Sequence, residues 1–182
     1  MVHFKASYDK SVVLITIACT LLFGGISVLF LRIHPKEPAE IIVVSLIVLS
    51  TLIGYVFVFL YSPLRYAIDS ENLLIVRPLK SVVIKRTDIV DISIPDKKTM
   101  IRSGRIGGVG GFFGFYGQFY NKNFGGEMTW YATRLSNFVL IKIKVVDKRW
   151  PKHLKFKLIV LTPDNYVGFV DELNKIYAGT NN

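Results

Sequence analysis

Two arginines lie among closely spaced glycines at the start of a segment, residues 102–126, that holds nine of the chain's 14 glycines. Glycine exposes backbone N–H groups and arginine adds positive charge, so Arg102 and Arg105 are candidates for binding an anion. No Gly-Lys-Ser/Thr sequence closes the segment as in a P-loop, and no strand-helix-strand unit surrounds it as in a dinucleotide-binding fold. The chemistry this pattern indicates is therefore anion binding of an unspecific kind.

The same segment is rich in aromatic side chains, of which Phe112, Phe113 and Phe115 are the most closely spaced. Aromatic rings are favoured at the interface between a membrane and water, so these residues are candidates for contact with a membrane or a protein partner. The competing interpretation is structural: a long, glycine-hinged connection whose aromatic residues cover the core. The sequence leaves anion binding, interfacial or partner contact and this structural role open.

A second group of candidates is basic. Lysines alternate with apolar residues around residues 142–144 and 155–157, which predicts two strands of a hairpin with the lysines on its outward face; the four are Lys142, Lys144, Lys155 and Lys157. Like charges facing each other across strands are destabilising unless anions neutralise them, and anionic lipid headgroups would do so. The alternative is a solvated face that protects strand edges.

Residues for catalysis are sparse. The three histidines lie far apart, at positions 3, 34 and 153, and the single cysteine, Cys19, lies in an apolar run. Asp88, Asp91 and Asp96 match no calcium-loop spacing and are expected at turns and caps. We therefore expect no enzyme activity, no metal and no cofactor.

The elements that position these residues begin with two uncharged apolar runs, residues 12–31 and 41–61. Twenty helical residues span about 30 Å, the thickness of the hydrocarbon core of a bilayer. The connection between the runs is too short to cross back, so the sequence predicts a transmembrane hairpin over residues 1–61 and one small domain over residues 62–182. The first run is too long for a signal peptide and lacks a cleavage site of small residues.

Charge favours one orientation of this hairpin. The protein carries a net charge of +10, and Lys5, Lys10, Arg65, Arg77 and Lys80 flank the two apolar runs. Cytoplasmic flanks collect such residues, so we expect both termini and the domain in the cytoplasm, at the cell membrane. The connecting loop also carries two cations, which keeps the inverted topology as the alternative. A domain held at a bilayer is not expected to bind nucleic acid.

After the hairpin, short β-like segments with turn signals between them predict a small sandwich or barrel of about seven antiparallel strands. The chain then ends in one amphipathic helix. Thr162 is its predicted N-cap, followed by Pro163 in the first turn and by apolar residues at helical spacing, among them Val170 and Leu173. The expected fold is an N-terminal transmembrane α-hairpin plus an all-β or α+β domain.

This order resembles a pleckstrin-homology (PH) domain, in particular the bacterial PH-like domains of small membrane proteins. The resemblance covers residues 62–178 and rests on four segments and the span pair; the segments are 62–66, 105–114, 129–133 and 162–164. It implies a PH-like barrel that serves as a binding or assembly module. Eukaryotic PH domains often bind phosphoinositides through basic residues of the first hairpin loop, but the corresponding Ser70-Glu71-Asn72 is acidic here.

The combined hypothesis is a non-enzymatic, membrane-anchored PH-like module at the cytoplasmic membrane surface. The alternative is an accessory subunit of a membrane transport or envelope complex that meets its partner through the transmembrane hairpin. Expected partners are the lipid membrane, anionic lipid headgroups, a membrane protein or a second copy of the chain. Small residues of the two runs would allow close helix packing; these are Gly24, Gly25, Ser27, Ser45, Ser50 and Gly54.

Overall fold

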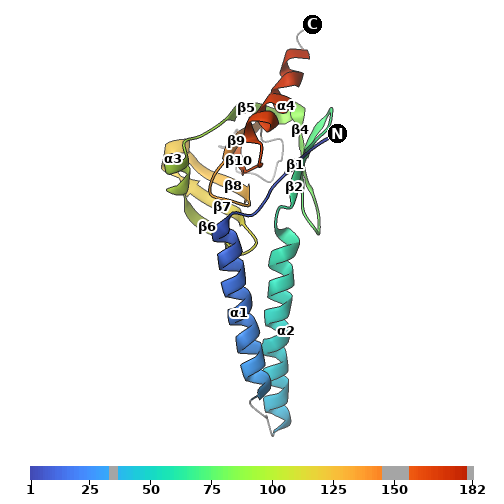
Figure 1. Cartoon of the computed structure of the whole chain (residues 1–182), viewed down its shortest axis with the longest axis vertical. Helices are drawn as coiled ribbons and strands as arrows, with labels where there is room; N and C mark the ends of the chain where they lie inside the picture. The colour runs from blue at the N-terminus through green and yellow to red at the C-terminus, as the bar shows by residue number, and fades with distance from the viewer. Residues whose placement is uncertain (33–36, 145–155, 180–182) are drawn as a thin grey trace.

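Two long helices stand at one end of the molecule and a domain of strands at the other, as Figure 1 shows for a computed structural model of the chain. The structure describes residues 1–32, 37–144 and 156–179. Helix α1 is Lys10–Arg32 and helix α2 is Pro38–Tyr61. Both are long and apolar enough to cross a membrane, and almost none of either apolar stretch is buried by the rest of the chain. The two predicted spans are thus present as candidate membrane-spanning helices rather than as core helices.

The first sheet combines one strand that precedes the helix pair in the chain with three strands that follow it. Its strands are β1 (Val2–Lys5), β2 (Arg65–Ile68), β3 (Asn72–Val76) and β4 (Val82–Lys85), in that spatial order and all antiparallel. Strand β1 precedes α1 and strand β2 follows α2, and the two pair with Phe4 opposite Tyr66. Both ends of the helix pair are therefore fastened into one sheet, which the sequence did not predict.

The second sheet has six strands in the order β5-β9-β10-β8-β7-β6. The bounds are β5 Ile89–Ser93, β6 Gly104–Gly110, β7 Phe115–Asn121, β8 Gly126–Ala132, β9 Val139–Lys144 and β10 Phe156–Leu161. The predicted class of fold is confirmed, with differences in detail. The described residues contain ten strands, and these form two sheets instead of a closed barrel. Strands β8 and β10 run parallel because β10 folds back from β9 to lie beside β8.

The remaining elements are short, apart from the last helix. They are the 3₁₀ turns η1 (Arg86–Asp88) and η2 (Lys122–Phe124), helix α3 (Lys97–Ile101) and helix α4 (Tyr166–Gly179). The N-cap predicted for the last helix is wrong. The side chain of Asn165 accepts from the N–H of Gly168 (3.0 Å), whereas the hydroxyl of Thr162 accepts from the N–H of Thr133 (2.9 Å) and is engaged away from the helix.

Two apolar clusters lie on the two faces of the second sheet. The larger one joins the two sheets to α4, through Phe169 and Leu173. The other gathers around Trp130, which stacks on Phe119 and is covered by Met100 of α3. Since successive residues of a strand point to opposite faces, β9 and β10 supply both clusters at once and leave few positions free for polar side chains.

Candidate functional site

The glycine-rich segment forms a hairpin, β6–β7, that bends sharply toward the helices. Gly108 and Gly117 face each other across it with φ of +111° and +122°. A Cβ on Gly108 would lie 2.3 Å from the carbonyl oxygen of Tyr116, and one on Gly117 would lie 2.4 Å from that of Gly107. Only glycine fits both positions, because the two backbones touch and the dihedral angles are left-handed. The glycines therefore serve to bend a strand pair.

The turn of this hairpin, residues 111–114, is the Gly-Phe-Phe-Gly tip, and it packs against both helices. The ring of Phe112 lies 6.1 Å from that of Phe23 on α1 and 5.3 Å from that of Tyr55 on α2. Phe113 lies 5.4 Å from Tyr55 and contacts a second ring of α2. The pairs with α2 are edge-to-face, and such pairs add ~0.5–1.5 kcal/mol each beyond the area they bury. The tip is an aromatic wedge between the helices.

Polar groups of the tip and of the start of β7 find partners on both helices. The N–H of Phe113 donates to the hydroxyl of Thr16 (3.0 Å), and the hydroxyl of Tyr116 donates to the carbonyl of Val58. Thr16 lies six residues into α1, ~9 Å along the helix. Non-helical backbone at membrane depth needs such internal partners. The contacts are those required of a tip that enters the apolar layer together with the helices.

The three candidate phenylalanines separate in the structure. Phe112 and Phe113 meet the helices, whereas Phe115 packs at the edge of the cluster around Trp130 within the domain. Arg102 ends helix α3 and is exposed, and the guanidinium of Arg105 lies across its own strand, over Gly110. The glycine N–H groups near these arginines belong to a strand, in which successive groups point in opposite directions and do not converge on an anion.

The predicted shared face of the lysines is wrong. Lys142 pairs with Leu158 and Lys144 with Phe156, but Lys157 pairs with Ile143 and so points to the opposite face of the sheet. Strand alternation puts Lys157 on the side of the larger cluster, where burial lowers the pKa of its ammonium group. Lys142 lies over the ring of Phe156, 4.4 Å from its centre. Lys155 falls outside the described residues.

The lysines also lie at the wrong end of the domain to meet a membrane that holds α1 and α2. Phe115, next to the tip, pairs with Ala132, and the neighbouring Tyr131 pairs with Leu161, which in turn pairs with Val139. From Val139, strand β9 runs away from the tip for five residues to Lys144, ~17 Å at the usual rise of a strand. The basic hairpin therefore faces away from the helix pair.

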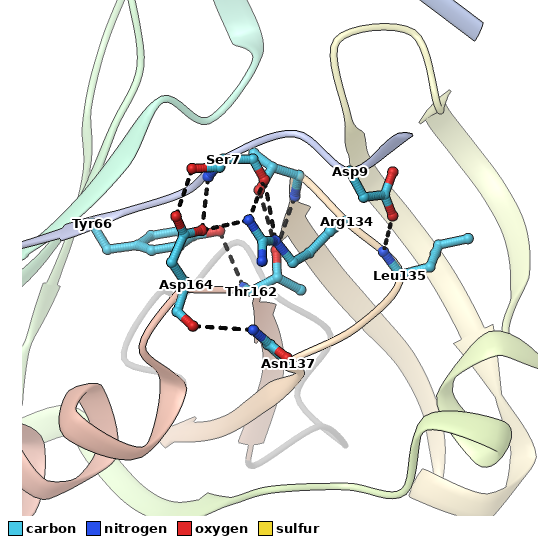
Figure 2. A network of polar contacts seen from close by, with 9 residues as sticks. Ser7, Asp9, Tyr66, Arg134, Leu135, Asn137, Thr162 and Asp164 are labelled. Atoms are coloured by element: carbon cyan, nitrogen blue, oxygen red, sulfur yellow. Dashed lines mark hydrogen bonds and ion pairs between the residues drawn. The ribbon is translucent and has the colours of Figure 1, made fainter. Parts of the chain in front are cut away.

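A second junction joins the segment before α1 to the segments that follow β8 and β10 (Figure 2). The carboxylate of Asp164 accepts from the N–H and the hydroxyl of Ser7 (2.9 and 2.5 Å). Arg134 donates to the same carboxylate (2.6 Å) and to the carbonyl of Ser7 (2.8 Å). Asp9 caps α1 through the N–H of Val12 (2.8 Å) and also accepts from the N–H of Leu135 in the loop after β8 (2.9 Å).

Behind this network lies a buried tyrosine. Tyr66 is fully buried, and its hydroxyl donates to the carbonyl of Tyr131 (2.6 Å) and accepts from the N–H of Thr162 (3.2 Å). Burial raises the pKa of this phenol to about 12. Apart from the N-cap spacing of Asp9 and Val12, the sequence carries no signal for this network, because its members are far apart in the chain.

A third junction is the turn between β3 and β4. The N–H of Leu79 donates to the carbonyl of Leu60 in the last turn of α2 (3.2 Å). The guanidinium of Arg77 lies over the rings of Tyr61 and Tyr131, 5.3 and 5.7 Å from their centres, and its Nε donates to the carbonyl of Lys80 (2.7 Å). This turn was not among the predicted sites.

Metal chemistry receives no support from the part of the chain that the structure describes. There, no three His, Cys, Asp or Glu side chains are grouped so that they could hold a metal ion. The described site consists of aromatic packing, hydrogen bonds and cations, which is the chemistry of binding and anchoring.

The arrangement of strands closed by a C-terminal helix agrees with the comparison with known families. Residues 64–176 match the family described as bacterial PH domain, and the chain belongs to this family. The resemblance inferred from the sequence is confirmed. No curated protein and no solved structure matches the chain. The matched region begins at β2, so β1, α1 and α2 lie outside it.

Proposed function

We propose that the protein is a non-enzymatic, membrane-anchored PH-like module that binds or assembles with a partner at the cytoplasmic membrane surface. The observation that carries this proposal is the pairing of β1 with β2 on either side of the helix pair. Together with the Gly-Phe-Phe-Gly tip, it fastens the domain to the helices at several points. A domain held in this way keeps one side toward the membrane and leaves its other surfaces to partners.

The cytoplasmic orientation is part of the proposal and is supported by charge. Lys5 pairs with Arg65 in the β1–β2 register, and Lys10 is the first residue of α1. Cations therefore lie beside the ends of both helices that adjoin the domain. Cytoplasmic flanks of spans collect such residues.

The surface proposed to meet a protein partner is the free edge of the second sheet. Strand β6 ends the order of that sheet and is seven residues long. Its Ile106 is 58% exposed. An edge strand presents unpaired N–H and C=O groups, which an extended segment of a partner can pair with.

The alternative, an accessory subunit that contacts its partner through the transmembrane hairpin, has one supporting observation. A Cβ added to Gly24, Gly25 or Gly54 would meet no other atom of the chain within 4 Å. These glycines are therefore not used to pack α1 on α2, and they leave smooth surfaces where a further helix could approach closely.

The experiment that separates the two proposals compares variants of the full-length chain, cross-linked in cells and purified in mild detergent. Ile106→Asp changes the β6 edge, and Gly25→Leu fills the open helix surface without a clash inside the chain. The module proposal expects a specific cross-linked partner that Ile106→Asp loses and Gly25→Leu keeps. The opposite result supports the subunit alternative. A wild-type chain that cross-links to no specific partner contradicts both.

A further inference from the structure

The turn between β3 and β4, residues 77–81, lies at the level where α2 ends. Leu60, which accepts from the N–H of Leu79, is the penultimate residue of α2. The last four carbonyls of a helix have no partner inside the helix, so this bond both caps α2 and fixes the height of the turn. Figure 1 shows the turn beside the upper end of α2. If α2 spans a membrane, residues 77–81 lie at its headgroup layer.

The turn exposes an apolar side chain at this height. Leu79 is 56% exposed although its backbone is bonded to the end of an apolar helix. Leu64, just after α2, is 42% exposed. Apolar side chains beside the end of a membrane helix are covered by lipid. Contact with lipid therefore explains why Leu64 and Leu79 are exposed when the chain is considered alone.

Arg77 is held in place while most of its hydrogen-bonding capacity stays unused. Two tyrosine rings flank the guanidinium, and the bond from Nε to the carbonyl of Lys80 fixes its direction. Within the described part of the chain, neither terminal amino group of Arg77 has a hydrogen-bond or carboxylate partner. A fixed guanidinium with two free amino groups matches the geometry of a phosphate, and Lys80 of the same turn is exposed.

We propose that residues 77–81 form a binding site for the phosphate of an anionic phospholipid of the membrane that holds the helices. Arg77 binds the phosphate through its terminal amino groups, Lys80 supplies a second cation, and Leu79 lies in the adjoining apolar layer. The site adds a lipid contact to the proposed membrane-anchored function. It rests on the proposal that the helices anchor the chain in a membrane, and not on the proposal that the domain binds a protein partner. It replaces the basic hairpin as the lipid contact, since Lys144 lies at the end of its strand remote from the helices.

The test uses the full chain in lipid nanodiscs in which phosphatidylglycerol replaces phosphatidylcholine stepwise. The measured quantity is the ratio of the two lipids that stay bound after extraction in mild detergent, relative to their ratio in the disc. The wild-type chain should enrich phosphatidylglycerol. Each cation near a membrane surface contributes ~1 kcal/mol, so Arg77→Gln and Lys80→Gln should each lower the enrichment about fivefold.

Two further variants control for charge and geometry. Lys85→Gln removes another exposed cation, from the other end of β4, and should leave the enrichment unchanged. Arg77→Lys keeps the charge but removes the pair of terminal amino groups of the guanidinium, and it should lower the enrichment. Unfolding temperatures in pure phosphatidylcholine discs show whether each variant folds, and Lys80→Gln, at an exposed position, tests the proposal should Arg77→Gln fail to fold.

The source of the phosphate is tested in a separate arm. Inorganic phosphate added to the chain in phosphatidylcholine discs should not raise the unfolding temperature, whereas phosphatidylglycerol discs should. Equal retention of both lipids, a loss with Lys85→Gln as large as with Lys80→Gln, or stabilisation by inorganic phosphate alone would overturn the proposal. None of these outcomes depends on the cross-linked partner, so failure of the lipid site and failure of the module proposal are distinguishable.

Discussion

The backbone N–H of Phe113 donates a hydrogen bond to the hydroxyl of Thr16, 97 residues earlier in the chain (3.0 Å). One residue belongs to the tip of the β6–β7 hairpin and the other to α1. Three residues further along the tip strand, Tyr116 bonds the carbonyl of Val58 on α2. The domain thus holds each helix separately, and the spacing of the helices next to the domain depends on the tip.

Gly111 is the glycine of the tip that lies against α1. Its φ is +107°, and an added Cβ would lie 2.5 Å from Cδ1 of Ile15 on α1. Gly111→Val should therefore lower the unfolding free energy of the full chain by ~1–3 kcal/mol, the usual cost of a strained backbone position. Gly104→Val is the control, since a Cβ there meets nothing within 4 Å. Denaturant unfolding in detergent micelles measures both, and equal losses would contradict the packing of the tip against α1.

Arg134 and Asp164 should act as a pair that also holds Ser7. Their contact is 2.6 Å long and the side chains are 17% and 32% exposed. Because both bond to Ser7, we expect the effects of Arg134→Gln and Asp164→Asn on the unfolding free energy to be non-additive, with a coupling of ~0.5–3 kcal/mol. A double-mutant cycle measures the coupling. Strict additivity would show that the network carries no joint stability.

The buried phenol of Tyr66 predicts a loss of stability in alkali. Its pKa rises from the ordinary 10.0 to about 12 on folding, so the folded state favours the neutral form. This stability is fully present below pH 10 and is lost as the pH rises from 10 to 12, in total ~2–3 kcal/mol. The difference in unfolding free energy between the wild type and Tyr66→Phe should shrink by that amount over this range. A constant difference would contradict the burial of the hydroxyl.

Leu173 tests the seating of α4. It is 1% exposed and lies in the larger cluster, so Leu173→Ala should lower the unfolding free energy by ~2–5 kcal/mol. Val167 is on the same helix but 51% exposed, so Val167→Ala should have an effect within about 0.5 kcal/mol, as for other surface positions. Thermal or denaturant unfolding compares the two variants, and similar losses would place α4 away from the sheets.

Topology is tested with single cysteines in a Cys19→Ser background. Glu37 and Ser70 are both exposed, one beside the loop between the helices and the other in the domain. With the domain in the cytoplasm, a membrane-impermeant thiol reagent applied to intact cells should label Glu37→Cys and leave Ser70→Cys unlabelled. Permeabilised cells serve as the control for Ser70→Cys. Labelling of Ser70→Cys in intact cells would reverse the orientation.

Much of the architecture follows from local patterns in the sequence. The long apolar runs, seven of the strands and the C-terminal helix have periodicities or lengths that identify them, and the family follows from their order. Of the strands that were not predicted, β6 lacks a composition typical of strands. Strand β6 is more than half glycine, which disfavours strands, and it exists because a bent hairpin needs glycine at Gly108 and Gly117.

The candidate site was less predictable because its contacts join distant parts of the chain. The sequence singled out Phe112 and Phe113, but their ring partners are on the helices and could not be read from spacing. The lysine faces were predicted with the wrong alignment, since a shift of one residue between β9 and β10 moves Lys157 to the other face. Arg77 was noted only as a cation flanking the apolar runs and not as a binding residue, because its surroundings, Tyr61 and Tyr131, are assembled only by folding.

The pairing of β1 with β2 imposes an order on synthesis. Strand β1 is made before the two helices and β2 after them, so β1 has to wait, without its partner strand, until both helices have been synthesised. If the two helices span a membrane, completion of the first sheet requires that the chain after α2 has returned to the side of the membrane on which β1 lies. A chain whose second helix failed to insert would leave both strands with exposed edges and would be recognisable to quality-control proteases.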